Sequence, residues 1–324
     1  MATGNEYIIG LDLGGTFLKY ALGEPNGKLI LHSKKPSEGN KPQEVVFGVI
    51  FSAIEEMLQE AEKRNGKVVA IGLGSPGAVH FEKGKLMGNT PNLRYWGDAE
   101  IKKNIEGKFS IPTWADNDAN LMVLAEATRG AAQGHKYVIA LTLGTGIGGG
   151  ILINGEIYRG VNYAGAELGH VSIAYNGRPC NCGGIGCIEQ YASAPAMVRE
   201  YIEMLTARQK PLPKGQITTE MIFARVKEGE PEAIETVDRT CEYLGSALAS
   251  IINAFNPEII VIGGGVSEAG DEFVQQIWHS LNRRAAGPVL SGLKLVRAQL
   301  GNKAGMVGAI SLASQMYYRE KNKG

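Results

Sequence analysis

The chain has 324 residues, of which 44 are glycine, and its 33 basic side chains equal its 33 acidic ones. This length is enough for two domains with substantial cores, and a net charge of zero argues against a nucleic-acid partner. The N-terminus lacks the charged and apolar regions of a signal peptide, and the longest uncharged stretch contains too many glycines for a membrane-spanning helix. We therefore expect a cytoplasmic protein with no membrane partner.

The first elements along the chain combine strands and a helix. Residues 7–11 form an apolar run that leads into Asp12-Leu-Gly-Gly-Thr16, and the dipeptide Asn26-Gly27 separates the next two apolar runs, as in a β-hairpin. Helical spacing of apolar residues follows over 43–65, and a buried strand is expected over 68–73. Strands that feed helices indicate an α/β domain.

The second half repeats this alternation. Helices are expected over 120–130, 194–205, 231–255 and 305–321, and strands over 137–143 and 258–262. Residues 139–146 have the same pattern as residues 9–16, an apolar strand followed by a glycine turn and a second strand. Hairpins with glycine turns are common, but a duplication that leaves one phosphate-binding hairpin in each half would produce the same pattern.

The glycine turns have a chemical use because they expose backbone N–H groups to phosphate oxygens. Neither half contains the Gly-x-x-x-x-Gly-Lys-Ser/Thr pattern, so the chain is not a P-loop protein. The run 146–150 has the wrong spacing for a dinucleotide fingerprint, and a strand follows where a helix should begin.

Two further motifs carry polar chemistry. The tripeptide Asp116-Asn117-Asp118 precedes a helix, so it is either an N-cap cluster or the source of a catalytic carboxylate, and the residues alone leave both interpretations open. Three of the 4 cysteines lie within residues 180–187, a spacing that indicates a metal site in a reducing compartment. Cys241 lies in a helical pattern and is expected to be a small buried residue.

Five motifs together resemble the ROK family of sugar kinases and repressors, in its order and at its spacing. They are Asp12–Thr16, Asp116–Asn120, Leu143–Gly150, Gly165–His170 and Cys180–Glu189. The resemblance implies an α/β protein with the actin-like ATPase (ribonuclease H-like) fold, in which two lobes surround a central cleft that binds sugar and ATP. It further implies a small lobe over 1–120 plus the C-terminal helix 306–324, a large lobe with a zinc-binding loop over 121–305, and a homodimer.

The resemblance also implies roles for individual residues. Asp118 is the expected general base, and structural Zn²⁺ is expected on His170, Cys180, Cys182 and Cys187, although three free thiols in a loop are the alternative. The sugar is expected to contact Asn117, Glu167, His170 and Glu189, with Gly77 and Asn92 at the rim. ATP is expected to contact Asp12, which also holds Mg²⁺, and Gly14, Gly15, Thr16, Thr145, Gly146, Gly264 and Gly265.

The expected reaction is ATP-dependent phosphorylation of a hexose. The segment Cys187-Ile-Glu189-x-x-Ala-Ser looks most like that of bacterial glucokinases, so glucose is the expected acceptor and glucose 6-phosphate the product. Alternative acceptors are N-acetylmannosamine, N-acetylglucosamine, fructose and allose. A ROK repressor that binds sugar as an inducer is the alternative from another class, but the first strand begins at residue 7, and we expect no DNA-binding domain.

Overall fold

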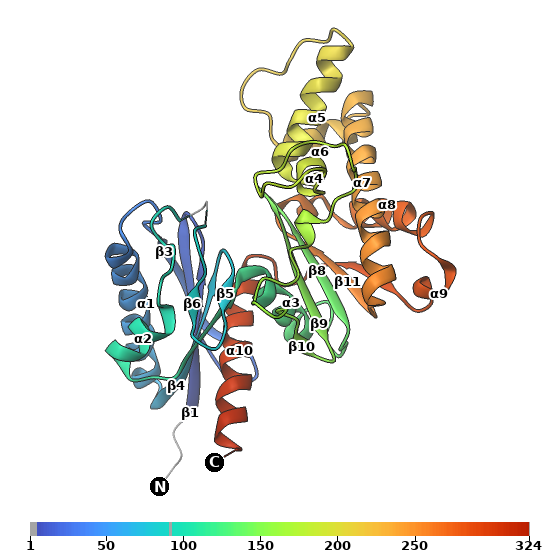
Figure 1. Cartoon of the computed structure of the whole chain (residues 1–324). Helices are drawn as coiled ribbons and strands as arrows, with labels where there is room; N and C mark the ends of the chain where they lie inside the picture. Colours follow the sequence, from blue (N-terminus) through green and yellow to red (C-terminus); the bar gives the residue numbers. More distant parts are fainter. Residues whose placement is uncertain (1–4, 91–92, 324) are drawn as a thin grey trace. The chain divides into compact units, whose positions relative to one another are not determined.

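The computed structural model describes residues 5–90 and 93–323 and consists of two compact units (Figure 1). The described residues of the first unit lie within 1–134, 157–166 and 300–324, and the second unit comprises 135–156 and 167–299. This division differs from the expected boundary at residue 120, because helix α3 (Asp118–Arg129) belongs to the first unit. Leu121 and Leu124 of α3 share a core with Ile310 of the C-terminal helix, which explains this placement.

The first unit is built on a five-stranded mixed sheet of order β3-β2-β1-β4-β7. Its antiparallel part is β1–β2–β3, and β4 and β7 continue it in parallel with β1. The strands are β1 (Asn5–Leu13), β2 (Phe17–Gly23), β3 (Leu29–Pro36), β4 (Gly66–Ser75) and β7 (Thr113–Asn117), and β5 (Val79–His80) and β6 (Lys85–Leu86) form a separate hairpin.

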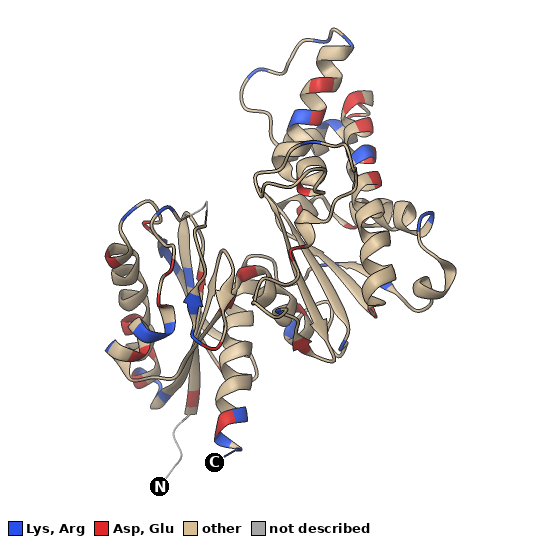
Figure 2. Cartoon of the chain, in the orientation of Figure 1, with Lys and Arg blue, Asp and Glu red and all other residues tan. Residues whose placement is uncertain are grey.

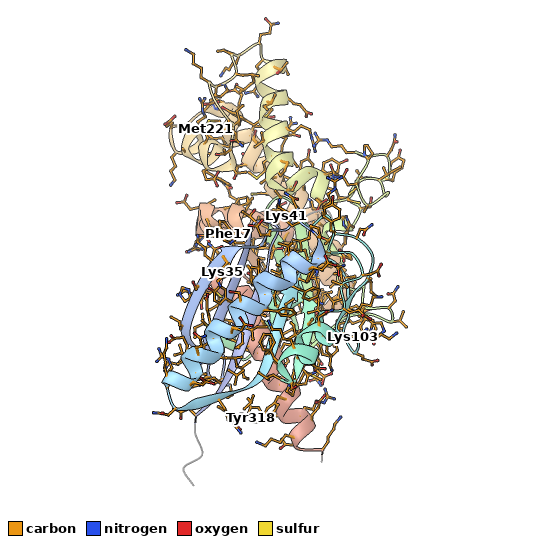
Figure 3. The ribbon with its side chains drawn as sticks, turned by 90° about the vertical axis from the view of Figure 1, so that its left-hand side faces the viewer. Phe17, Lys35, Lys41, Lys103, Met221 and Tyr318 are labelled. Carbon is orange, nitrogen blue, oxygen red and sulfur yellow. The ribbon has the colours of Figure 1, made fainter. Side chains whose placement is uncertain are left out.

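Alternate residues of these strands pack on opposite faces of the sheet, as the pleat requires. Ile9, Leu11 and Leu13 join the core beneath α1 (Gln43–Lys63) and α2 (Ile101–Phe109), whereas Ile8 joins the core beneath α3 and α10 (Ala304–Lys321). Lys35 of β3, which is labelled in Figure 3, forms a salt bridge with Glu56 of α1.

The C-terminal helix α10 lies directly on the backbone of the sheet (Figure 1). Gly10 of β1 and Gly72 of β4 are register partners. A Cβ atom at Gly10 would lie 2.4 Å from the carbonyl oxygen of Met306, and one at Gly72 would lie 1.9 Å from that of Ala309. Only glycine permits this approach, so these two positions bring the start of α10 close to the end of β1.

The second unit has a five-stranded sheet of order β10-β9-β8-β11-β12. β8 pairs antiparallel with β9 and parallel with β11, which pairs parallel with β12. The strands are β8 (Val138–Leu143), β9 (Ile147–Ile153), β10 (Glu156–Ile157, at the boundary of the two units), β11 (Ile259–Gly263) and β12 (Lys294–Arg297).

Helices complete the second unit, and the long helix α7 (Pro231–Phe255) is central to them. It begins with proline at its first position and ends at Asn256 in the left-handed conformation, which agrees with the predicted range. It packs against α4 (Glu189–Ala192), α5 (Ala194–Ala207), α6 (Thr219–Lys227) and α8 (Asp271–Asn282). Shorter helical turns are η1 (Leu168–His170), η2 (Gly265–Ala269) and α9 (Gly287–Leu290), and η3 (Gly301–Lys303) precedes α10 in the first unit.

The two sheets have the same topology. In each, a central strand is followed by an antiparallel hairpin partner on one side and by two parallel strands on the other. The sequence echo between residues 9–16 and 139–146 therefore marks structurally equivalent hairpins. Acidic and basic residues alternate along the ribbon of both units, in keeping with the zero net charge (Figure 2).

Candidate active site

The carboxylate of Asp12 lies near the end of β1, just before the turn into β2. Its Oδ2 atom lies 3.7 Å from Nζ of Lys19, its partner across the hairpin. The side chain also packs against Gly305, where an added Cβ would lie 2.3 Å from Cγ of Asp12. Burial raises the pKa of Asp12, and Lys19 opposes this shift. A carboxylate held in this way is a suitable oxygen ligand for a divalent cation.

The turn after Asp12 has a defined backbone. The N–H of Gly14 donates to the carbonyl of Phe17 over 2.9 Å. Ser37 donates hydrogen bonds to two carbonyl groups of the turn. Its Oγ donates to the carbonyl of Gly15 over 2.8 Å, and its N–H donates to the carbonyl of Thr16 over 3.0 Å. Gly15 and Thr16 are exposed. The turn is therefore both fixed and accessible, as an anion-binding turn has to be.

Asp116 and Asp118 have different environments. Asp116 is only 1% exposed, and its Oδ2 accepts from Nε of Arg159 over 2.8 Å and from Nη2 over 2.7 Å. Its Oδ1 accepts from the N–H of Asn117 over 2.8 Å and from Nδ2 of Asn120 over 2.9 Å. Asp118, in contrast, is exposed at the first residue of α3. Asp116 therefore has a structural role, and Asp118 is the carboxylate that a substrate can reach.

Asn117 is the N-cap of α3. Its side-chain oxygen accepts from the N–H of Ala119 over 2.9 Å and from that of Asn120 over 3.3 Å. The N-cap interpretation of the tripeptide 116–118 is therefore confirmed for Asn117, and Asp118 beside it has an exposed carboxylate. Asp118 lies in the first turn of α3, and the N-terminal end of a helix favours a negative charge.

The predicted rim residue Gly77 is tied to this junction. It has a φ angle of +90°, a left-handed conformation that favours glycine. Its carbonyl accepts from Nδ2 of Asn117 over 3.0 Å, which joins the loop after β4 to the start of α3. Asn92, the other predicted rim residue, lies outside the described residues.

The turn between β8 and β9 contacts a residue that is distant in sequence. The N–H of Gly144 donates to the carbonyl of Gly146 over 2.9 Å, and Thr145 between them is exposed. The Oε2 atom of Glu189 accepts from the N–H of Ile147 over 3.0 Å, and a Cβ at Gly146 would lie 2.6 Å from that same oxygen. The predicted phosphate-binding turn and the predicted sugar ligand Glu189 are therefore in direct contact.

Glu167 and His170 are placed against the same strand. They bracket the helical turn η1, and the N–H of His170 donates to the carbonyl of Glu167 over 3.0 Å. Between them, Gly169 lies on β9 so closely that an added Cβ would be 1.9 Å from the carbonyl oxygen of Ile147. The turn η1 thus packs on the first residue of β9, which the carboxylate of Glu189 also contacts.

His170, Cys180, Cys182 and Cys187 form one cluster, in which all four ligand atoms lie within 4.8 Å of one another. The Sγ of Cys180 lies 3.7 Å from Nδ1 of His170, and the Sγ atoms of Cys182 and Cys187 are 3.6 Å apart. Tetrahedral zinc with Zn–S distances of about 2.3 Å places its ligands roughly 3.8 Å apart. The four residues therefore fit a closed zinc site and contain no disulfide.

The thiols of this cluster differ in their surroundings. Burial raises the pKa of Cys187 to about 12. The exposed Cys182 has a lowered pKa, because its Sγ accepts a hydrogen bond from the N–H of Gly184 over 3.4 Å. Outside the cluster, Cys241 is buried in α7, as expected for a small core residue.

Gly264 and Gly265 connect β11 to η2 and are exposed. Gly264 has a φ angle of +85°, and an added Cβ would lie 2.4 Å from the carbonyl oxygen of Leu143 at the end of β8. Strand packing alone therefore explains a glycine at position 264, while both residues remain accessible.

Sequence reasoning missed several polar residues beside the predicted ones. Lys19 pairs with Asp12, Arg159 pairs with Asp116, and Nε2 of Gln190 donates to the Sγ of Cys180 over 3.7 Å. No motif marks them, because their partners are brought near by the fold. For Lys19 alone a signal existed, since a hairpin centred on Gly15 and Thr16 places residues 12 and 19 opposite each other.

A sequence profile of the ROK family matches residues 8–316. The chain belongs to the ROK family. A glucokinase of Halalkalibacterium halodurans is 35% identical to it over 318 residues, 96% of each chain. A ROK family glucokinase from Streptomyces griseus, whose crystal structure is in complex with glucose and AMPPNP, is 32% identical, with a TM-score of 0.80 over 95% of this chain and 99% of its own. A xylose repressor of Caldicellulosiruptor bescii is 28% identical over 94% of this chain and 77% of its own.

Membership of the ROK family confirms the resemblance drawn from the five motifs and the expected α/β, actin-like ATPase fold. In this ROK protein each motif ends a strand, begins a helix or forms the cysteine loop, so each lies where a side chain or a turn is accessible. Across residues 5–90 and 93–323, no helix has both the length and the apolar composition needed to cross a membrane.

Proposed function

We propose that this ROK sugar kinase transfers the γ-phosphoryl group of ATP to a hydroxyl of glucose, producing glucose 6-phosphate and ADP. The proposal is carried by the exposed carboxylate of Asp118, which the N-cap Asn117 presents at the start of α3. Glucose and ATP are supported by the relatives, one of which is a glucokinase and another a structure with glucose and AMPPNP.

Asp118 acts as the general base in this proposal. A sugar hydroxyl is a weak nucleophile, and Asp118 accepts its proton as the bond from oxygen to the γ-phosphorus forms and the bond to ADP breaks. Nδ2 of Asn117 uses one hydrogen for the carbonyl of Gly77 and donates the other to a neighbouring sugar hydroxyl.

The second unit supplies the remaining sugar contacts. Oε2 of Glu189 is engaged by the N–H of Ile147, so Oε1 accepts from a sugar hydroxyl. Glu167 accepts from another, and His170 faces the sugar with Nε2 because its Nδ1 faces Cys180. A site of this kind rejects sugars that lack a matching hydroxyl, since a carboxylate covered by the bound sugar would then lose its donor.

The phosphates are proposed to contact both glycine turns, at residues 14–16 and 145–146, through backbone N–H groups and through the hydroxyl of Thr145. Asp12 would hold Mg²⁺ directly or through water, and its partly buried carboxylate is a suitable ligand for that cation. When bound, Mg²⁺ neutralises charge on the phosphate oxygens during transfer.

A cavity of about 770 Å³ in the second unit is the proposed site of the nucleoside. Thr145 of the second turn is one of its lining residues, so a phosphate bound at this turn would adjoin the cavity. Its walls come from α5, the loop 216–218 and the start of α6, with the apolar side chains Val198, Ile202 and Ile217 available to a base. Because α6 also packs against η2, the exposed Gly265 adjoins this wall.

The Cys/His cluster is proposed to bind structural zinc. All four coordination positions would be protein ligands, so no position remains for a substrate or a reactive water. The metal would fix the loop between His170 and Cys187, the two ends of which lead into the sugar ligands Glu167 and Glu189.

The decisive experiment is a panel of hexoses and N-acetylhexosamines assayed with Mg·ATP, with kcat/KM determined for each. We expect the highest value for glucose. A higher kcat/KM for N-acetylmannosamine, N-acetylglucosamine, fructose or allose would overturn glucose as the acceptor while retaining the kinase reaction.

The same assay separates an enzyme from a sugar-binding repressor. The repressor alternative is supported by the similarity of this chain to a xylose repressor. Binding of a sugar, measured by calorimetry, without ADP formation from any member of the panel would favour the repressor. ADP formation that depends on the sugar would exclude it.

A further inference from the structure

The helix that carries Glu189 is too short to be stable by itself. α4 spans four residues, a single turn, and an isolated helix of this length does not persist in water. Its last carbonyls also have no partner within the helix and require donors from elsewhere. The direction of the Glu189 side chain therefore depends on the groups that hold α4 from outside.

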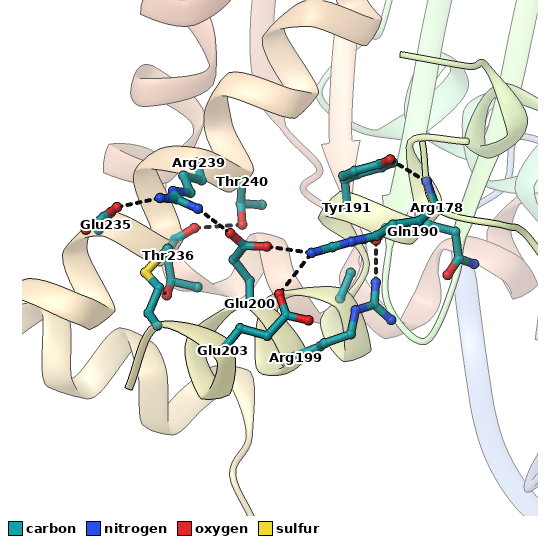
Figure 4. A network of polar contacts seen from close by, with 12 residues as sticks. Arg178, Gln190, Tyr191, Arg199, Glu200, Glu203, Glu235, Thr236, Arg239 and Thr240 are labelled. Carbon is teal, nitrogen blue, oxygen red and sulfur yellow. Dashed lines mark hydrogen bonds and ion pairs between the residues drawn. The ribbon is translucent and has the colours of Figure 1, made fainter. Parts of the chain in front are cut away.

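Arg178 contacts α4 through three different groups (Figure 4). Its Nη1 donates to the carbonyl of Gln190 over 3.1 Å, and its backbone N–H donates to Oη of Tyr191 over 2.7 Å. The guanidinium also lies over the ring of Tyr191, 5.0 Å from the centroid. Arg178 precedes Cys180 by two residues, so it connects the cysteine loop to α4 independently of the metal ligands.

The other side of the guanidinium is anchored by acidic residues of α5. Nη2 of Arg178 donates to Oε2 of Glu200 over 2.9 Å and to Oε2 of Glu203 over 3.1 Å. Glu200 is only 4% exposed, and its Oε1 accepts from Nη1 of Arg239 over 2.8 Å. Two guanidiniums thus flank one buried carboxylate, and the planar fork of Arg178 joins that carboxylate to the backbone of α4 (Figure 4).

The residue next to Glu189 is held at both ends. The backbone carbonyl of Gln190 accepts hydrogen bonds from Arg178 and from Arg199. The side chain of Gln190 donates to the Sγ of Cys180. Glu189 itself is fixed by the N–H of Ile147 through Oε2. Movement of the Gln190 carbonyl would turn the start of α4 and with it the free oxygen of Glu189.

We propose that Arg178 is a positioning residue for sugar binding, which holds Glu189 in place by tying the α4 backbone to the buried carboxylate of Glu200. This inference rests on the proposed role of Glu189 as a sugar ligand. It concerns affinity for the sugar, because Arg178 contacts neither the turn at residues 144–146 nor Asp118.

The test is Arg178→Lys. A lysine keeps the positive charge beside Glu200 but lacks the fork that bonds Glu200 and the Gln190 carbonyl together. We expect the KM for glucose to rise by about tenfold, as for loss of an outer partner of a ligand. The KM for ATP, kcat and zinc content should stay within about twofold of wild type.

The matched control is Arg239→Lys, the same change on the other oxygen of Glu200. Arg239 donates to Glu200 on α5 and to Glu235 on α7, and within the described part of the chain it makes no hydrogen bond to α4. The KM for glucose of the Arg239→Lys variant should stay at the wild-type value. An equal rise in both variants would assign the effect to helix stability and overturn the inference.

A second variant covers the case in which Arg178→Lys folds poorly. Tyr191→Phe removes the acceptor of the Arg178 N–H without changing any charge. We expect a rise of about threefold in the KM for glucose, with hydrogen exchange faster in 189–192 and unchanged in α7. An unchanged KM and unchanged exchange in this folded variant would overturn the inference.

The double variant Arg178→Lys/Glu189→Gln separates this inference from the proposed function. If Arg178 acts through Glu189, the two changes in KM are less than additive. If Glu189→Gln alone leaves the KM for glucose unchanged, the proposed role of Glu189 fails. A rise caused by Arg178→Lys in that case would show that Arg178 acts by another route, which also overturns the inference.

Discussion

The two sheets share one topology, yet their first turns obtain an acidic side chain in different ways. In the first unit the acid belongs to the strand itself, since Asp12 lies in β1 beside Lys19. In the second unit the aligned position is Thr142, and the acid is Glu189, which comes from α4 and bonds the N–H of Ile147. The same backbone therefore serves both turns, while the side chains around them differ.

This difference suggests a division of labour between the units. The first unit contains Asp12 and Asp118, carboxylates suited to a cation and to a proton. The second contains the cysteine cluster, Glu189 and the cavity beside Thr145, which are suited to binding. Changes at Asp12 and Asp118 of the first unit should therefore lower kcat, and changes in the second unit should raise a KM.

The largest effect is expected for Asp118→Asn. The amide cannot accept the hydroxyl proton, so kcat should fall by roughly 10²–10⁴ while glucose still binds. A coupled ADP assay measures turnover, and calorimetry measures glucose affinity. Turnover close to wild type would remove Asp118 as the base and with it the catalytic role of the first unit.

Asp116→Asn is the matched control for this variant. The same carboxylate-to-amide change here leaves Arg159 without its ion-pair partner in a buried setting, which costs about 3 kcal/mol of unfolding free energy. We expect a lower Tm with kcat per folded molecule retained. A selective loss of kcat at unchanged Tm would assign Asp116 to the reaction.

Asp12→Asn should follow in size. Loss of a carboxylate ligand weakens the hold on Mg²⁺, so kcat should fall by about 10² and the Mg²⁺ concentration for half-maximal activity should rise. Titration with Mg²⁺ at saturating glucose and ATP measures both. An unchanged titration curve would show that Asp12 serves the packing of Gly305 against β1 and has no part in metal binding.

Zinc removal tests the second unit. We expect about one zinc per chain by metal analysis, and removal by a chelator should raise the KM for glucose by about tenfold with a smaller change in kcat. Asp118→Asn should retain its zinc, because the cluster lies in the other unit. Folded, freshly purified protein without zinc would contradict the proposed metal site.

The smallest effect is expected for Thr145→Ala. Loss of one hydroxyl hydrogen bond to phosphate costs about 1 kcal/mol, which corresponds to roughly a fivefold higher KM for ATP. Thr145→Ser keeps the hydroxyl and should resemble wild type. A change in the KM for glucose in place of that for ATP would contradict the assignment of this turn to phosphate.

Elements with local signals were predictable from the sequence. Helix α7 has the predicted range, because Pro231 suits the first helical turn and Asn256 adopts the left-handed conformation that ends it. The glycine turns and the cysteine spacing were equally local, and they were sufficient to indicate the family. Short elements such as β7 and β12 lacked such signals, because their place in a sheet depends on strands far away in the chain.

Without the family resemblance, the residues of the tripeptide 116–118 did not indicate which carboxylate is accessible. Asp116 and Asp118 flank the same asparagine, and nothing in the local sequence distinguishes their side chains. Only the tertiary structure brings Arg159 to Asp116, across 43 residues of chain, and so leaves Asp118 as the exposed acid. The sequence by itself determined which residue types and turns are present, and packing between distant segments decided which of them are buried, paired or accessible.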